Sequence, residues 1–124
     1  MTKKSKCKCG INPKLIFSCS GAADVGSITD SVARELTFEG VGNMFCLAGI
    51  GGRVSGIMKS TQKAEKILVI DGCPMACAKN CLTKAGFKDF EYINLADMGM
   101  KKGETEPNNC NISKIITKAK EKLS

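Results

Sequence analysis

The chain has 124 residues, and its 43% hydrophobic and 25% charged residues suit one globular domain and argue against a disordered or low-complexity protein. It has no apolar run of about 18 residues and no apolar segment after its basic start, which argues against a membrane span or a signal peptide and predicts a cytoplasmic protein. The net charge of +7 is concentrated in lysines near the two ends with few aromatic residues between them, so we expect solvated lysines and neither a nucleic-acid nor a membrane partner.

The apolar pattern predicts four strands, each followed by a helix. Strands are expected at 15–19, 44–48, 66–70 and 90–95. The first helix ends near Gly40, the second follows the glycine-rich segment 49–52, the third opens at Pro74 and ends at Gly86, and the last begins near Asn111. The segment 96–109 reads as a loop.

Alternating strands and helices predict an α/β fold. We expect an open parallel four-stranded sheet, in the order 2-1-3-4, with helices on both faces in a Rossmann-like three-layer arrangement. Ligands of such sheets bind beyond the carboxyl ends of the strands, where the strand order reverses. Residues 1–13 are expected to form a basic, flexible N-terminal segment, and residues 14–124 a single domain.

The cysteine content is the most unusual feature of the composition. The chain has eight cysteines and no histidine. The lack of histidine excludes Ser-His-Asp and Cys-His catalysis and any zinc site that uses imidazole. Because cytoplasmic thiols stay reduced, metal binding or redox chemistry is a better interpretation than a disulfide framework.

Four of these cysteines are expected at the same edge of the sheet. Cys19 ends the first strand, Cys46 lies late in the second, and Cys73 directly follows the third. Spacing of four residues would put Cys73, Cys77 and Cys81 on one stripe of the following helix. Four thiolates each about 2.3 Å from one ion make a zinc site, and Cys19, Cys46, Cys73 and Cys77 could meet that geometry. The alternative is that cysteines such as Cys46 and Cys81 are ordinary core residues.

Three long segments around these cysteines resemble the motifs of the DGC-domain family. They are Cys19-Ser20-Gly21-Ala22-Ala23-Asp24-Val25-Gly26, the stretch 45–57, and 70–79, which contains the tripeptide Asp71-Gly72-Cys73. The resemblance covers about 14–102. It implies a zinc-binding protein whose four ligands match Cys19, Cys46, Cys73 and Cys77, and it implies no particular reaction.

Zinc is the metal that we expect, although ligand softness alone also allows copper(I) or an iron–sulfur cluster. Backbone N–H groups of the glycine-rich turns and Arg53 could offset the thiolate charge. Cys7 and Cys9 form a Cys-x-Cys pair that could capture or deliver an ion, which suggests a role in metal storage or delivery. Cys110 is interpreted as a structural residue. The sequence indicates no catalytic residue and no particular protein partner.

A thiol enzyme is the main alternative. A nucleophilic thiolate at Cys73, favoured by a helix N-terminus, or at Cys19 could carry redox or anion-processing chemistry. A phosphatase-like loop would need an arginine six positions after the cysteine, but residue 25 is valine and Arg53 lies seven positions after Cys46. The segment 49–53 could also bind a phosphate, although it lacks the usual glycine spacing. A third alternative is a partner-binding scaffold that uses the loop 96–109 and the basic ends.

Overall fold

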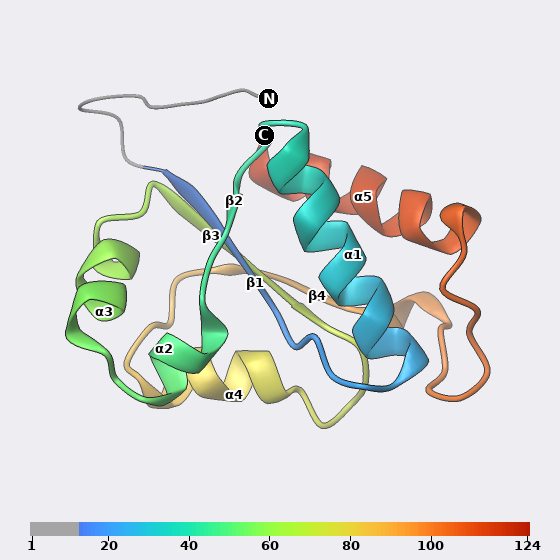
Figure 1. The fold of residues 1–124 in the computed structure, drawn as a ribbon, viewed down its shortest axis with the longest axis horizontal. Helices are drawn as coiled ribbons and strands as arrows, with labels where there is room; N and C mark the ends of the chain where they lie inside the picture. The colour runs from blue at the N-terminus through green and yellow to red at the C-terminus, as the bar shows by residue number, and fades with distance from the viewer. Residues whose placement is uncertain (1–12) are drawn as a thin grey trace.

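The computed structural model describes residues 13–124. The predicted Cys7–Cys9 pair, and all but the last residue of the predicted N-terminal segment 1–13, therefore lie outside the described residues. The elements follow one another as β1 (Lys14–Ser18), α1 (Asp24–Phe38), β2 (Asn43–Met44), α2 (Leu47–Gly51), α3 (Ser55–Gln62), β3 (Lys66–Asp71), α4 (Cys77–Lys84), β4 (Glu91–Asn94), the 3-10 helix η1 (Leu95–Met98) and α5 (Asn109–Leu123) (Figure 1).

The four strands form one parallel sheet in the order β2-β1-β3-β4, which confirms the predicted α/β class and strand order. The central pair is in register over the whole of β1, from Lys14 opposite Lys66 to Ser18 opposite Ile70. At the far edge, Asp71 at the end of β3 lies opposite Asn94 at the end of β4. The carboxyl ends of β1, β3 and β4 therefore meet at one edge of the sheet.

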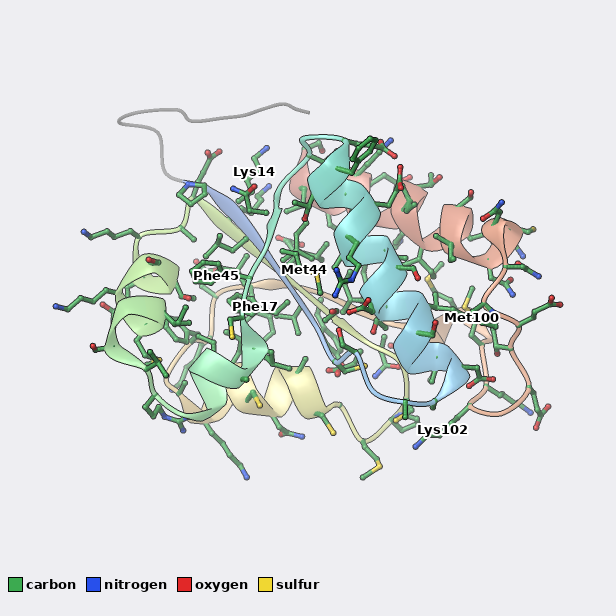
Figure 2. The ribbon with its side chains drawn as sticks, in the orientation of Figure 1. Lys14, Phe17, Met44, Phe45, Met100 and Lys102 are labelled. Atoms are coloured by element: carbon green, nitrogen blue, oxygen red, sulfur yellow. The ribbon has the colours of Figure 1, made fainter. Side chains whose placement is uncertain are left out.

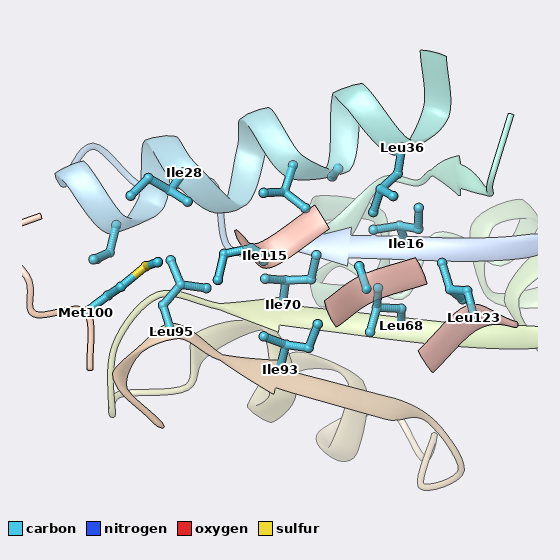
Figure 3. Packing of buried hydrophobic residues seen from close by; sticks show 14 residues of the cluster. Ile16, Ile28, Leu36, Leu68, Ile70, Ile93, Leu95, Met100, Ile115 and Leu123 are labelled. Atoms are coloured by element: carbon cyan, nitrogen blue, oxygen red, sulfur yellow. The ribbon is translucent and has the colours of Figure 1, made fainter. Parts of the chain in front are cut away.

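Alternate residues of the strands enter two separate cores, one on each face of the sheet. Ile16, Leu68, Ile70 and Ile93 pack beneath α1 and α5 (Figure 3). The opposite face packs against α2, α3 and α4 and includes Phe17, which is fully buried. Burial on both faces accounts for the continuous apolar run in β3.

The second strand is shorter than predicted, so the expectation that Cys46 lies in it is wrong. The strand ends at Met44, whose N–H donates to the Thr37 hydroxyl at 2.7 Å. Cys46 then takes an extended conformation as the N-cap of α2, and its Sγ accepts the Gly49 N–H at 3.3 Å. A side-chain cap here turns the apolar run 44–48 into a helix start.

The helix after β3 also begins later than predicted. We expected it to open at Pro74, but α4 starts at Cys77, after Ala76 in a left-handed conformation with φ of 53°. The reason is that the Asp71 carboxylate accepts the N–H groups of Ala78 and Lys79 at 2.8 and 2.9 Å, which fixes the first turn. Cys73 is therefore outside the helix, and the predicted stripe of three cysteines reduces to Cys77 and Cys81.

The C-terminal part differs from prediction in two details. A short 3-10 helix, η1, occupies part of the expected loop, and α5 begins at Asn109 with an Asn108 cap, so that Cys110 is an exposed helix residue. The rest of the loop is held to α1, because the N–H groups of Gly103 and Thr105 both donate to Asp24 at 2.9 and 3.0 Å. Within residues 13–124, no helix is long and apolar enough to cross a membrane.

Candidate metal centre

An open cleft of about 510 Å³ lies at the carboxyl end of β1, next to the short strand β2 and beside α2. Three cysteines from separate segments line it: Cys19, Cys46 and Cys81. The rest of its lining is mainly apolar and comes from Met44, Phe45, Leu47, Ala48 and Gly51, with Ser18, Ser20 and Asp30 at one side.

The wall beside Cys46 is fixed by aromatic packing. The ring of Phe45 meets that of Phe17 edge to face, with centroids 6.0 Å apart; both residues are labelled in Figure 2. The Phe45 N–H donates to the Ile16 carbonyl at 2.8 Å, which extends the pairing of β2 with β1 by one residue. Because Phe17 is fully buried, the segment that delivers Cys46 is anchored to the core.

Cys19 is half-buried at the end of β1. Its N–H donates to the Ile70 carbonyl at 3.1 Å, so the pairing with β3 runs one residue beyond the strand. Its Sγ lies 3.4 Å from the Thr29 hydroxyl of α1. The backbone therefore holds Cys19 firmly, and only its side chain is free to turn.

Cys46 is exposed in the cleft, and the Gly49 N–H points at its sulfur. An N–H donor stabilises a negative sulfur, so one of the glycine-rich donors predicted for the thiolates is in place. Arg53 does not take this role. Its guanidinium donates to the carbonyls of Ile50 and Gly51 at 2.8 and 3.2 Å and so closes the C-terminal end of α2.

Asp30 is the carboxylate of the cleft. It accepts the Ser20 hydroxyl at 2.8 Å and the Arg34 Nε at 2.6 Å. Partial burial alone would raise the pKa of Asp30, but these two bonds outweigh burial and lower it. Asp30 is therefore an ionised carboxylate already engaged by protein donors.

The other two predicted ligands are placed differently. Cys73 is half-buried and packs against the core beneath α1 and α5, whereas Cys19 and Cys81 pack with the core on the other face. Cys77 is exposed at the start of α4 and is not among the residues that line the cleft. The structure thus brings Cys19 and Cys46 to one cleft, adds Cys81, and leaves Cys73 and Cys77 outside its lining.

Thiols are the kind of ligand that soft metal ions prefer, but the described residues do not hold a complete set of them in a binding arrangement. In the part of the chain from 13 to 124, no three Cys, Asp or Glu side chains are arranged to hold a metal ion together. All six cysteines there are free thiols. The four-cysteine site accordingly stays a prediction, and any complete ligand set must assemble on binding.

A polar network holds the segment between Cys73 and α4, and the sequence analysis did not identify it. The buried Asp71 accepts the Tyr92 hydroxyl at 2.9 Å in addition to the two N–H groups of α4. Asn94 donates to the Cys73 carbonyl and to the Tyr92 hydroxyl, both at 3.0 Å. Burial, together with Asp71, raises the pKa of Tyr92, which keeps its proton as the donor. Polar residues at the adjoining ends of β3 and β4 were the available signal.

Close backbone contacts explain two glycines of the cysteine-bearing motifs. A Cβ on Gly72, next to Cys73, would lie 2.9 Å from the Cβ of Val25 at the start of α1. A Cβ on Gly26 would overlap the Gly21 carbonyl in the turn after Cys19. Only glycine lets these segments approach so closely, which ties the turns after β1 and β3 to the first turns of α1.

Strained backbone lies in all three cysteine-bearing segments. Ser20, Arg53 and Ala76 have φ of 52°, 56° and 53°, the left-handed region that favours glycine. Ser20 directly follows Cys19, Ala76 directly precedes Cys77, and Arg53 follows α2. Each such residue costs about 1–3 kcal/mol, and strain of this kind is found most often at functional sites.

These features define a class of protein: a parallel α/β domain whose cysteine-bearing turns gather at the carboxyl end of the sheet. The chain matches the DGC domain family over residues 15–119 and belongs to that family. It is also similar to the anaerobic and virulence modulator AnvM of Pseudomonas aeruginosa, with 32% identity over 88 residues, which are 71% of this chain and 67% of the relative. No solved structure matches the chain. Family membership and the cysteine-rich composition are compatible with a metal-binding role.

Proposed function

We propose that this protein binds a soft metal ion, zinc in the first instance, through cysteine thiolates at the carboxyl end of the sheet. The candidate ligands are Cys19, Cys46, Cys73 and Cys77, and the role is metal storage or delivery. The observation that carries the proposal is that two of these ligands, Cys19 and Cys46, come from separate segments of the chain and line one cleft. Soft sulfur donors without any histidine suit zinc, copper(I) or an iron–sulfur cluster better than a hard cation.

In this proposal the four sulfurs come together around the metal ion only when it binds. Cys46 and Cys77 are exposed, and Cys73 lies in a turn between β3 and α4, so these sulfurs occupy loops and helix ends rather than the strand interior. Each binding thiol gives up its proton to solvent. A zinc ion held by four thiolates has no open coordination position, whereas three thiolates leave one position for exchange.

Elemental analysis of the full chain, purified without chelators or nickel columns, tests this proposal. We expect about one zinc per chain. To keep Cys7 and Cys9 from contributing, the parent protein should carry Cys7→Ser and Cys9→Ser. In that background Cys46→Ser should lose most of the metal, and the exposed Cys110→Ser should retain it. A parent protein that binds no soft metal would overturn the proposal.

A second function, a cysteine-dependent redox or anion-processing enzyme, is favoured by one observation. The exposed sulfur of Cys46 lies in an open cleft and accepts the Gly49 N–H at 3.3 Å. This arrangement points to Cys46 rather than to Cys73, because α4 begins at Cys77 and leaves Cys73 without a helix N-terminus. The enzyme hypothesis predicts one fast-alkylating cysteine in metal-free protein, and turnover that persists with chelator present.

A further inference from the structure

Cys81 shares the cleft with Cys19 and Cys46. It lies in the second turn of α4, between positions whose side chains, Ala78 and Leu82, are fully buried against the sheet. Its sulfur faces the backbone of α2, because a Cβ built on Gly51 would lie 3.9 Å from it. Both Gly51 and Cys81 line the cleft.

The same face of the sheet supports all three thiols. Cys19 and Cys81 both pack at the margin of the core formed with α2, α3 and α4, and Cys46 caps the first turn of α2. Helices α2 and α4 pack against each other, so the positions of Cys46 and Cys81 depend on one contact. Cys73, by comparison, packs with the core on the opposite face.

We infer that Cys81 supplies a thiolate ligand to a soft metal ion bound in this cleft, together with Cys19 and Cys46. This inference rests on the proposed function and adds a ligand to its set. On binding, the Cys81 S–H bond breaks, the sulfur keeps the electron pair and donates it to the metal, and the proton passes to solvent. The metal is neither oxidised nor reduced.

The three sulfurs must move toward one another on binding, because no three Cys, Asp or Glu side chains within residues 13–124 are already arranged around an ion. A cysteine side chain has one rotatable bond and three staggered positions for its sulfur. The sulfur of Cys19 is held only by its contact with Thr29, and that of Cys46 by the Gly49 N–H. The inference requires each of these sulfurs to exchange its present contact for a bond to the metal.

The test is a titration of the full chain carrying Cys7→Ser and Cys9→Ser with cadmium, whose thiolate complexes absorb in the ultraviolet. Relative to this parent, Cys81→Ser should weaken cadmium binding by at least about tenfold, since even loss of a group that supports a ligand costs about that much. It should also lower the charge-transfer absorption and the number of protons released. The matched control Cys110→Ser, an exposed cysteine on α5, should match the parent in all three.

Equal affinity, absorption and proton release in Cys81→Ser and Cys110→Ser would overturn the inference. If Cys81→Ser fails to fold, alkylation of the parent provides the answer. Bound cadmium should protect Cys81 from iodoacetamide and leave Cys110 reactive, whereas equal labelling of Cys81 with and without cadmium would contradict the assignment. Failure of the proposed function itself is distinct, because the parent would then bind no cadmium at all.

Discussion

Replacement of Gly26 by alanine tests the close contact between α1 and the turn that follows Cys19. A Cβ at this position would overlap the Gly21 carbonyl and lie 2.7 Å from the Gly21 nitrogen. Both atoms belong to the backbone, which cannot turn aside as a side chain can. The new methyl group must therefore push α1 away from the turn that carries Cys19.

The magnitude follows from a matched substitution. Gly56, on the exposed side of α3, has nothing within 4 Å of its built Cβ, so Gly56→Ala adds only helix propensity. Both glycines lie in the first turn of their helices, so this term favours alanine by at most about 1 kcal/mol and is common to both variants. Overpacking costs about 1–3 kcal/mol, and a rigid backbone neighbour puts Gly26→Ala at the upper end. We expect Gly26→Ala to be destabilised by about 2 kcal/mol and Gly56→Ala to be slightly stabilised.

Urea unfolding followed by circular dichroism measures both variants against the parent. In a domain of this size, 1 kcal/mol moves the Tm by about 4 °C, so thermal unfolding should separate the two variants by about 10 °C. A Gly26→Ala protein as stable as Gly56→Ala would refute the close approach of α1 to the Gly21 turn, and with it our account of how that turn is positioned.

Two further predictions concern polar contacts. Asp24→Asn should make the stability of the protein depend less on acid pH. The Gly103 and Thr105 N–H groups lower the pKa of Asp24, so its carboxylate stabilises the fold above its unfolded pKa, near pH 4. This contribution is lost as the pH falls through the lower pKa of the folded state. Urea unfolding between pH 3 and pH 7 checks it, and an unchanged pH profile would contradict it. Tyr92→Phe should destabilise the protein by about 1–2 kcal/mol, because Asp71 loses a donor and Asn94 an acceptor, and chemical unfolding at neutral pH measures the loss. A stability equal to that of the parent would show that the network around Asp71 does not hold the turn.

The sheet could be predicted because its signals are local and repeated. The continuous apolar run of β3 indicates a strand buried on both faces, and the handedness rule for parallel crossovers then limits the strand order. Two glycines also predicted where helices end. Gly40 and Gly86 both have the left-handed conformation expected just past a helix.

The errors came from contacts between distant residues. The start of α4 is set by Asp71, whose side chain reaches Ala78 and Lys79, and this long-range cap overrides the preference of Pro74 for a first helical turn. The length of β2 depends on the hydroxyl of Thr37, which lies in another element. The helix and strand propensities of neighbouring residues cannot predict either of these long-range contacts.

The candidate site could be predicted only in part for the same reason. Cys19 directly follows β1 and Cys46 caps the helix that follows β2, and both line one cleft. The late start of α4 separated Cys73 from the helical stripe, and the packing of α4 on α2 brought Cys81 into the cleft. The spacing of cysteines in the sequence cannot distinguish these outcomes, because it depends on where the helix begins.

X-ray absorption at the zinc edge of the metal-loaded protein, lacking Cys7 and Cys9, tests the central claim most directly. The account predicts that the neighbours of zinc are mainly sulfur atoms at about 2.3 Å. A shell of only oxygen or nitrogen at about 2.0–2.1 Å, or a protein that retains no zinc, would contradict it.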